Sequence, residues 1–386
     1  MPIAVRTVPL SDSVADRIRQ IDRAATAADG LSPFNDTAHL YLGAPGGRVL
    51  VAVNDDGVVV GAAIVVEGAA QVVVDPAWRR RGAGRALVST LRLGETGVEP
   101  GETSASPIAS DKVDLWSFGD HPGARALAAE FGLTAVRALL IMERDLIADP
   151  PSPTPAPPGT LIREFEPDDL DAVVALNALA FRHHPEQGQL TIGDFEQRMM
   201  TDWFDPDGLL LAVDTAPGND DVAAAQHRLV RDGRLLGFHW TKIHPADEPR
   251  PATRTASSLQ TLTDPERAAD TTDSEFPRDL ALSPNADNGR IPRTPTPGNE
   301  TRGRLTSEPT PFGEVYVLAV APEAAHHGWG RRLLERGLDY LAGREVTEVI
   351  LYVEGDEDRV VSLYQRSGFH EVRRDLRYAA TKEEGS

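Results

Sequence analysis

The strongest constraint on the fold is a sequence motif, called the phrase below, that the chain contains twice. Residues 71–88 read QVVVDPAWRRRGAGRALV, and residues 315–334 read VYVLAVAPEAAHHGWGRRLL. In both copies an apolar β-branched run ends near a proline, and Gly-x-Gly then opens an apolar segment that contains arginine; Gly82 matches Gly328. A repeat of this kind in a chain of 386 residues predicts two domains of similar architecture.

Charge and composition exclude several classes of partner and site. The formal net charge is -20, with 59 acidic against 39 basic residues, so most of the surface would repel nucleic acid and anionic membranes. The absence of cysteine excludes disulfides, thiolate metal sites and cysteine nucleophiles. The N-terminus lacks a signal-peptide pattern, and the apolar run at 58–66 is shorter than the roughly 20 residues of a membrane helix. We expect a cytoplasmic protein without nucleic-acid or membrane partners.

Proline-rich segments divide the chain. Residues 149–159, DPPSPTPAPPG, predict an extended linker between an N-terminal domain at 1–148 and a C-terminal domain at 160–386. Residues 246–311 are rich in proline, threonine and charge, and Phe276 is their only aromatic residue. Such a segment cannot bury enough apolar surface to offset its ordering entropy, so we expect a disordered insertion in the second domain.

The order of apolar patterns predicts the same architecture in each domain. A strand hairpin precedes each copy of the phrase, an amphipathic helix follows it, and a further strand and helix complete the unit. The segments are 48–66 and 209–243 for the hairpins, 85–93 and 331–344 for the helices, and 112–118 and 348–354 for the later strands. We therefore expect an α+β fold, a mixed β-sheet flanked by helices and built twice.

Gly-x-Gly between a strand and a helix is suited to a pyrophosphate, because the first turn of a helix leaves amide groups unpaired. Two common phosphate motifs do not fit. A P-loop needs Lys-Ser/Thr after its second glycine, where this chain has Arg85 and Arg331. A dinucleotide fingerprint needs Gly or Ala three residues after its second Gly, where Leu87 and Leu333 stand.

The segment RRRGAG at 79–84 resembles the Arg/Gln-x-x-Gly-x-Gly/Ala loop of the GNAT acyltransferases. The resemblance implies that acetyl-CoA is the cosubstrate, with the loop amides on its pyrophosphate and the preceding strand along its pantetheine arm. The second copy departs from the pattern at Ala325, His326 and His327, which implies weaker binding there. Carried over by position, the coenzyme contacts are Val72, Val73, Val74, Arg80, Arg81, Gly82, Ala83, Gly84 and Arg85, and Leu318, Ala319, Val320, Ala325, His326, His327, Gly328, Trp329, Gly330 and Arg331.

Five further blocks give a narrower resemblance. They are HPEQG, WFDPDGLLLA, GRLLGFHWTKIHP, GEVYVLAV and LYVEGD, and in this order they resemble the mycothiol synthase family of tandem GNAT enzymes. The resemblance implies acetyl transfer to the cysteinyl amine of desacetylmycothiol (cysteinyl-glucosaminyl-inositol), the last step of mycothiol biosynthesis. It also implies a coenzyme-binding but non-catalytic first domain. The implied substrate contacts are Asp36, Glu186, Lys242, Glu314 and Tyr352.

The two copies differ in their proton-transfer groups. Transfer from a thioester to an amine needs a base for the ammonium proton and an acid for the leaving thiolate. Glu314 lies on the motif strand, where the first domain has Gly68. Tyr352 and Tyr364 are both candidate acids, and the first domain has Trp116 and Ala128 at their places. We therefore assign catalysis to the C-terminal domain, with Glu314 as the base, acting directly or through water. The resemblance favours Tyr352 as the acid, although Tyr364 matches the usual GNAT phenol and the choice stays open.

Two other functions remain open at this point. One is a tandem GNAT enzyme for another amine, such as an aminoglycoside or a protein N-terminus. The other is a non-catalytic acyl-CoA-binding module. The histidine pairs at 183–184 and 326–327 lack a third ligand at a recognised spacing, so we expect no metal. A monomer that takes acetyl-CoA and a small-molecule amine is the expected assembly.

Overall fold

The order of elements repeats, as the sequence predicts. The computed structural model describes residues 3–43, 47–66, 68–93, 113–182, 187–216, 228–248, 250 and 310–380. The N-terminal half contains β1 (Ala4–Pro9), α1 (Asp12–Asp29), α2 (Asp36–Tyr41), β2 (Arg48–Val53), β3 (Val59–Val66), β4 (Ala69–Val74), η1 (Pro76–Trp78), α3 (Ala83–Leu93), β5 (Asp114–Ser117), α4 (Pro122–Glu130) and β6 (Leu133–Asp145).

The C-terminal half repeats this order, with a longer connection between β10 and β11. Its elements are β7 (Thr160–Glu164), η2 (Pro167–Asp169), α5 (Leu170–Ala180), η3 (Gln187–Gln189), α6 (Ile192–Met199), η4 (Pro206–Gly208), β8 (Leu209–Asp214), β9 (Leu229–Val230), β10 (Gly233–His244), β11 (Phe312–Val320), η6 (Pro322–Ala324), α9 (Trp329–Gly343), β12 (Glu348–Glu354), α10 (Asp358–Arg366) and β13 (His370–Ala380). Most of the predicted insertion, residues 249 and 251–309, lies outside the described residues.

One sheet runs through both halves. Its order is β1-β2-β3-β4-β5-β13-β6-β12-β11-β10-β8-β7, and β9 pairs with β10 off this path. The last strand of each half is inserted between the last two strands of the other, so β13 pairs with β5 and β6, and β6 pairs with β12 and β13. The linker at 149–159 therefore divides the sequence but not the sheet, which the sequence did not predict.

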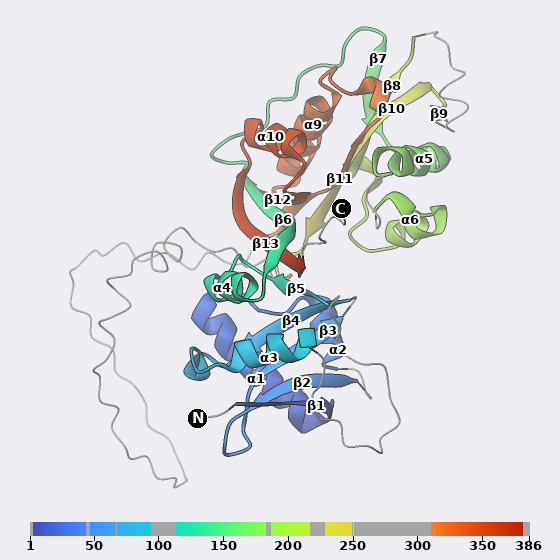
Figure 1. Cartoon of the computed structure of the whole chain (residues 1–386). Coiled ribbons are helices and arrows are strands. Elements are labelled where there is room, and N and C mark those ends of the chain that lie inside the picture. Colours follow the sequence, from blue (N-terminus) through green and yellow to red (C-terminus); the bar gives the residue numbers. More distant parts are fainter. Residues whose placement is uncertain are drawn as a thin grey trace, which may run out of the picture.

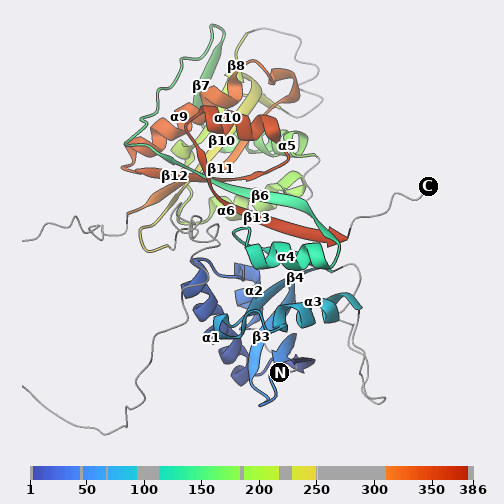
Figure 2. The same cartoon turned by 60° about the vertical axis from the view of Figure 1, so that its left-hand side comes forward.

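The exchanged strands are visible at the junction of the halves. Figure 1 shows teal β6 and red β13 between the blue N-terminal half and the C-terminal half above it. In Figure 2, turned by 60°, the same two strands again lie side by side above α4. Their antiparallel ladder extends from His370↔Glu143 to Ala380↔Leu133. Each half thus needs the other to complete its hydrogen-bonded ladder, because an unpaired central edge would expose backbone donors and acceptors.

Helices cover both faces of the sheet, which confirms the predicted α+β fold. In the N-terminal half, α1 and α2 pack on Val49, Val51 and Ile64, while α3 packs on the alternating residues Leu50 and Ala63. This alternation follows from the two-residue period of a strand. Among the described residues, none of the helices combines the length and the apolar character of a membrane span.

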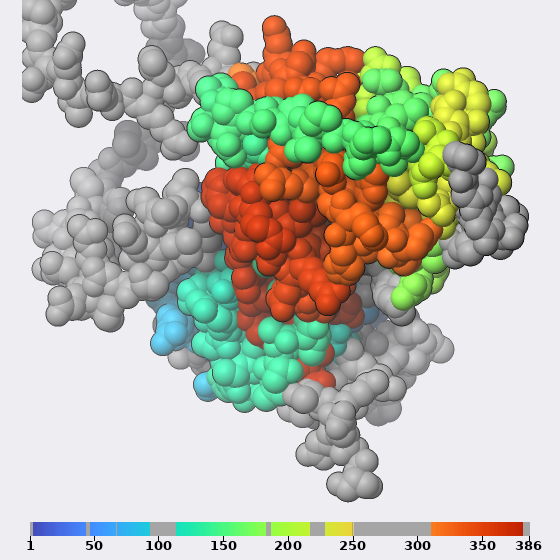
Figure 3. Space-filling model, turned by 90° about the horizontal axis from the view of Figure 1, so that it is seen from above, coloured from blue at the N-terminus to red at the C-terminus, as the bar shows by residue number. Residues whose placement is uncertain are grey.

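The linker packs along the C-terminal half. The backbone amide of Ser152 lies 3.3 Å from Oε2 of Glu335 on α9, and Ala156 packs against the core beneath β8 and β10. Figure 3 shows this green segment lying across the orange and red surface of the C-terminal half. These contacts fasten the linker to one half of the molecule.

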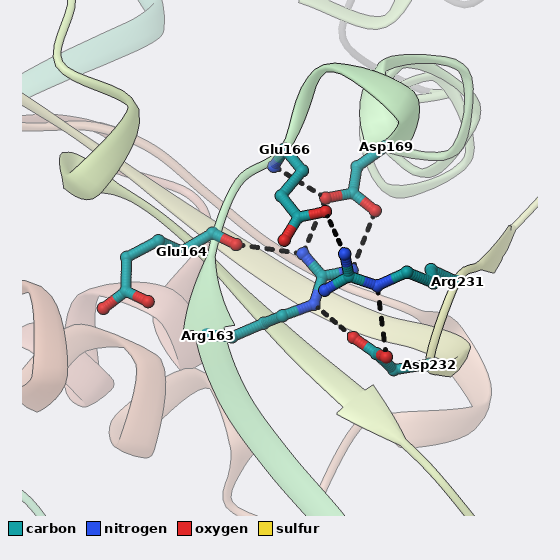
Figure 4. A network of polar contacts seen from close by, with 6 residues as sticks. All are labelled: Arg163, Glu164, Glu166, Asp169, Arg231 and Asp232. Carbon is teal, nitrogen blue, oxygen red and sulfur yellow. Dashed lines mark hydrogen bonds and ion pairs between the residues drawn. The ribbon is translucent and has the colours of Figure 1, made fainter.

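An ion-pair network fastens the start of the C-terminal half (Figure 4). Arg163 on β7 donates to both carboxylate oxygens of Asp169, at 2.6 and 2.8 Å, and to Asp232 at 2.9 Å. Arg231 pairs with Glu166 at 2.6 Å and with Asp232 at 3.4 Å. The network joins β7, η2 and the β9–β10 turn. Each of its cations faces carboxylates, so we assign it a structural role.

Candidate active site

The two glycine loops follow the same backbone path. In the first loop Arg80 and Gly82 have φ of 62° and 91°, and in the second His326 and Gly328 have φ of 66° and 80°. A 3-10 turn precedes each loop and a helix follows it. Left-handed residues in such a turn direct successive amides to one side and form a concavity for anions. The histidines of the second loop therefore leave this backbone geometry intact.

A cavity of about 670 Å³ lies against the first loop. It is large enough for a small-molecule ligand, since such sites typically measure about 300 to 1,000 Å³. Tyr378, on the exchanged strand β13, also lines it. Arg81 is not among the lining residues, and its guanidinium carbon lies 4.8 Å from the centre of the Trp78 ring. The other predicted contacts of this half line the cavity: Val72, Val73, Val74, Arg80, Gly82, Ala83, Gly84 and Arg85.

An ion pair braces the first loop at a position where the second loop has a different residue. Arg79 donates two hydrogen bonds to Asp29, at 2.7 and 2.6 Å. Burial raises the pKa of Asp29, but hydrogen bonds from His121 and Arg79 outweigh this effect and hold that pKa well below its usual range. The second loop has Ala325 at the place of Arg79 and so cannot form this contact.

In both halves the strand before the glycine loop, β4 or β11, pairs with its parallel neighbour over only part of its length. The β4–β5 ladder ends at Gln71↔Trp116, although β4 continues to Val74. The β11–β12 ladder ends at Glu314↔Ile350, although β11 continues to Val320. Beyond these points one edge of the motif strand is available to an extended ligand arm. The predicted contacts Leu318, Ala319 and Val320 lie on this part of β11.

The remaining second-loop candidates surround the start of α9. Ala325, His326 and His327 precede the helix, and Gly328 is its N-cap residue. The side chain of Trp329 is buried in the core, so coenzyme contact there would involve its backbone. Gly330 and Arg331 complete the first turn. In the described part of the chain, no group of three His, Asp or Glu side chains is arranged to hold a metal ion.

Glu314 is a buried carboxylate at the end of the β10–β11 hairpin. Lys242 is its Cα partner across the ladder, and the residue is only 9% exposed. Its Oε2 lies 2.7 Å from Nε2 of His244, and Nδ1 of the same ring lies 2.7 Å from Oε1 of Glu248. The His244 ring stacks on Phe312, with centroids 4.3 Å apart and planes 2° from parallel.

His244 and Glu248 are not among the predicted site residues. His244 follows Lys242 by two residues, so alternation along the strand could have placed it on the face of Glu314. Glu248 fell inside the segment expected to be a disordered insertion, and its contact with His244 was therefore missed.

The two candidate acids lie in different environments. Tyr352 is two residues beyond Ile350, the ladder partner of Glu314, so it shares the face of Glu314, and it is 45% exposed. Burial raises the pKa of Tyr352 to about 12, and the charge of Glu314 adds to this shift. Tyr364 is buried beside Phe369, with ring centroids 5.8 Å apart, and burial raises its pKa as well.

The predicted substrate contacts come from both halves. Asp36 is the first residue of α2, after the N-cap Asn35, and its charge contributes to the raised pKa of Tyr352. The N-terminal half adjoins the site through β6, whose Ile141 is the ladder partner of Tyr352. Nζ of Lys242 lies 5.4 Å from the centre of the Trp203 ring. Glu186 lies outside the described residues.

Comparison with known proteins agrees with this fold. The acetyltransferase (GNAT) family matches residues 297–369, and an acetyltransferase (GNAT) domain matches residues 45–111. The chain is 35% identical over 381 residues to the mycothiol acetyltransferase of Clavibacter michiganensis subsp. michiganensis, which covers 97% of this chain and 93% of that protein. It is also 35% identical to the mycothiol acetyltransferase of Tsukamurella paurometabola, over 92% of each chain.

Among solved structures, a GCN5-related N-acetyltransferase from Sphaerobacter thermophilus is similar in fold. The TM-score is 0.52 at 18% identity, and the match covers 97% of this chain and 94% of that one. At this identity the likeness concerns the fold alone.

Proposed function

The chain belongs to the mycothiol acetyltransferase family of GNAT proteins, and we propose that its C-terminal half transfers acetyl from acetyl-CoA to the cysteinyl amine of desacetylmycothiol. One observation carries the assignment of the site. Glu314, Lys242 and Tyr352 share one face of the sheet, at the point where β11 and β12 separate.

In this proposal Glu314 accepts the proton of the substrate ammonium. An α-amino group titrates near about 8, so a carboxylate at this place has a modest task, and a bridging water can complete the contact. The neutral amine attacks the thioester carbon, and the carbon–sulfur bond breaks. The departing sulfur takes a proton from Tyr352, whose raised pKa of about 12 keeps the phenol protonated at neutral pH.

We assign the acid role to Tyr352 because its side chain is half-exposed and shares the face of Glu314. Tyr364 packs within the core of the C-terminal half, beside Phe369. The second glycine loop would hold the coenzyme pyrophosphate with its backbone amides, and the free edge of β11 would take the pantetheine arm.

The N-terminal half is proposed to bind acetyl-CoA without turning it over. The cavity of about 670 Å³ and the left-handed residues of its loop support this proposal. However, Gly68 lies in the turn before β4, with φ of 76°, where the C-terminal half has Glu314 on a strand. Trp116 and Ala128 stand where the C-terminal half has its two tyrosines, so neither a base nor an acid is present at the equivalent positions.

Acetyl transfer can be tested by incubating the full chain with acetyl-CoA and desacetylmycothiol, and by following the acetylated product by mass spectrometry. We expect one acetyl group on the cysteinyl amine. Parallel reactions with an aminoglycoside and with a peptide that has a free N-terminus measure acceptor preference. Faster transfer to either of these would contradict the proposed substrate, and no transfer to any acceptor would contradict catalysis.

A further inference from the structure

Three ionisable side chains form a line at the end of the β10–β11 hairpin. Oε2 of Glu314, the ring of His244 and Oε1 of Glu248 are joined by two contacts of 2.7 Å. Glu314 and His244 are buried, with 9% and 6% exposure, whereas 40% of the Glu248 side chain is exposed. The line therefore runs from a buried carboxylate to one at the surface.

Proton counting restricts the state of these groups. An ionised carboxylate has only lone pairs, and an oxygen and a nitrogen at 2.7 Å need a hydrogen between them. Two such contacts require two protons among the three groups. The arrangement that keeps both carboxylates ionised is a doubly protonated His244 ring, which donates from Nε2 to Glu314 and from Nδ1 to Glu248.

We infer that His244 is a positioning residue for the base Glu314, and that Glu248 holds the His244 ring in its working orientation. The inference rests on the proposed function. Buried carboxylates without a partner tend to take up a proton, and a protonated carboxyl cannot accept another from an amine. The hydrogen bond from His244 stabilises the ionised form, and it occupies Oε2, which leaves Oε1 of Glu314 for the substrate amine or its bridging water.

Neighbouring side chains fix the ring from its face as well as from its edge. Phe312 is the ladder partner of His244 and stacks on its ring. The guanidinium carbon of Arg250 lies 5.4 Å from the centre of the Phe312 ring, and Arg250 also pairs with Glu348 at the start of β12. Arg250 thus connects the chain just after Glu248 to both β11 and β12. These contacts hold Glu248 where it can contact His244.

The test compares turnover and coenzyme affinity in four full-length variants: His244→Gln, Glu248→Gln, Glu314→Gln and the double variant His244→Gln/Glu314→Gln. Asp247→Asn is the matched control, because it removes the same charge from an exposed neighbour of Glu248. We expect His244→Gln to lower kcat by about 10- to 100-fold and Glu248→Gln by about 10-fold, both below the full contribution of a general base. KM for acetyl-CoA should be unchanged.

The double variant separates positioning from a general structural role. A residue that acts through Glu314 has little left to do once Glu314 is glutamine, so His244→Gln should add almost nothing in that background. An undiminished effect of His244→Gln in the Glu314→Gln background would overturn the inference. If His244→Gln does not fold, equal kcat values for Glu248→Gln and Asp247→Asn would overturn it instead.

Histidine NMR gives a readout that does not depend on the identity of the substrate. With ¹⁵N-labelled histidine, His244 should show two exchange-protected ring N–H signals, both absent from His244→Gln, and Glu248→Gln should shift the Nδ1 signal. A singly protonated ring in the wild type that does not respond to Glu248→Gln would contradict the geometry. Absence of transfer to desacetylmycothiol with these signals intact would contradict only the proposed function.

Discussion

The N-terminal and C-terminal halves share a loop geometry but differ at the hairpin before the motif strand. In the first half this hairpin closes after the pair Val66↔Ala69. The second half contains three further pairs beyond the corresponding point, Lys242↔Glu314, Ile243↔Gly313 and His244↔Phe312. The proposed base and the residue that orients it both belong to this extension. In the proposed assignment, both halves therefore share the loop for the coenzyme, whereas the base depends on a few added residues on one hairpin.

A second difference lies beneath the motif helices. His239 in the C-terminal half is fully buried and packs against Gly337 of α9, where an added Cβ would lie 2.1 Å from Nδ1 of the ring. At the positions equivalent by strand and helix register, the N-terminal half has Ala63 and Leu91. The C-terminal half thus has its large side chain, His239, on the strand, whereas the N-terminal half has its large side chain, Leu91, on the helix. Each pair combines one large and one small residue.

The largest expected effect comes from Glu314→Gln, which removes the base and nearly preserves its shape. Turnover should fall by about 10²- to 10⁴-fold, the usual contribution of a general base, because the amide cannot accept the ammonium proton. The affinity for acetyl-CoA should be unchanged. Steady-state kinetics near neutral pH measure both, with Asp247→Asn as the control, and wild-type turnover in Glu314→Gln would remove the proposed distinction between the halves.

Tyr352→Phe should have the next largest effect, a decrease in kcat of about 100-fold, at the lower end for acid–base groups. Tyr364→Phe should leave kcat close to the wild type, because that phenol is packed in the core. The pKa of Tyr352 is raised to about 12, so kcat should not fall through loss of this proton below about pH 11. A larger loss in Tyr364→Phe would transfer the acid role to Tyr364.

Gly337→Ala should destabilise the protein by about 1 to 3 kcal/mol, since the new methyl group overlaps His239. The double variant His239→Ala/Gly337→Leu copies the pairing of Ala63 and Leu91 in the N-terminal half, and it should recover most of the lost stability. Urea unfolding of the full chain measures these differences. A double variant less stable than Gly337→Ala would show that the two halves pack differently at this point.

The buried His239 also predicts that the stability of the folded chain depends on pH. Burial lowers the pKa of His239 to about 4, from the ordinary histidine value of 6.5. The unfolded chain therefore binds a proton between these values while the folded chain does not, and stability is lost as pH falls from about 6.5 towards 4. At about 1.36 kcal/mol per pKa unit, the loss approaches about 3 kcal/mol. The double variant should lack this part of the acid sensitivity, and an unchanged pH dependence would exclude His239 as its source.

A matched pair of loop variants tests the two proposed coenzyme sites. Gly82 and Gly328 are both left-handed, and alanine there costs about 1 to 2 kcal/mol, equivalent to roughly tenfold weaker binding. Gly328→Ala should raise KM for acetyl-CoA, whereas Gly82→Ala should weaken only the second, non-catalytic site. Calorimetry should use the full chain, since Tyr378 of the C-terminal half lines the N-terminal cavity. A single binding site in the wild type would contradict the assignment of both loops.

The smallest effect is expected from shortening the insertion. Replacing residues 251–309 by a few Gly and Ser residues should leave turnover nearly unchanged, because closure entropy changes by only about 0.6 kcal/mol per doubling of loop length. Replacing all of 246–311, the bounds predicted from composition, should lower turnover because it removes Glu248. Equal turnover in the two shortened proteins would contradict the role of Glu248, and loss of activity in the first would assign a contribution to the segment itself.

Local patterns in the sequence were sufficient for the two-fold architecture. A strand, a glycine loop and a helix are each specified by residues that are close together in the chain. The repeated pattern around Gly82 and Gly328 was therefore enough to predict these three elements in both halves. The family resemblance, together with Glu314 at the place of Gly68, also led to the prediction that the C-terminal half is the catalytic one. The site residues remain predictions, but the structure places Glu314, Lys242 and Tyr352 on one face of the sheet.

The way in which the halves are joined, and the surroundings of Glu314, became known only from the folded structure. A strand pattern reports which face is buried and not which edge it pairs with, so β6 and β13 could not be assigned to each other's halves from sequence. The contact of Glu248 with His244 was hidden by a composition that predicts disorder, and the bond from His244 to Glu314 spans the insertion. These features depend on groups that meet only after the sheet has formed, and their positions are set by its ladder rather than by their neighbours in the chain.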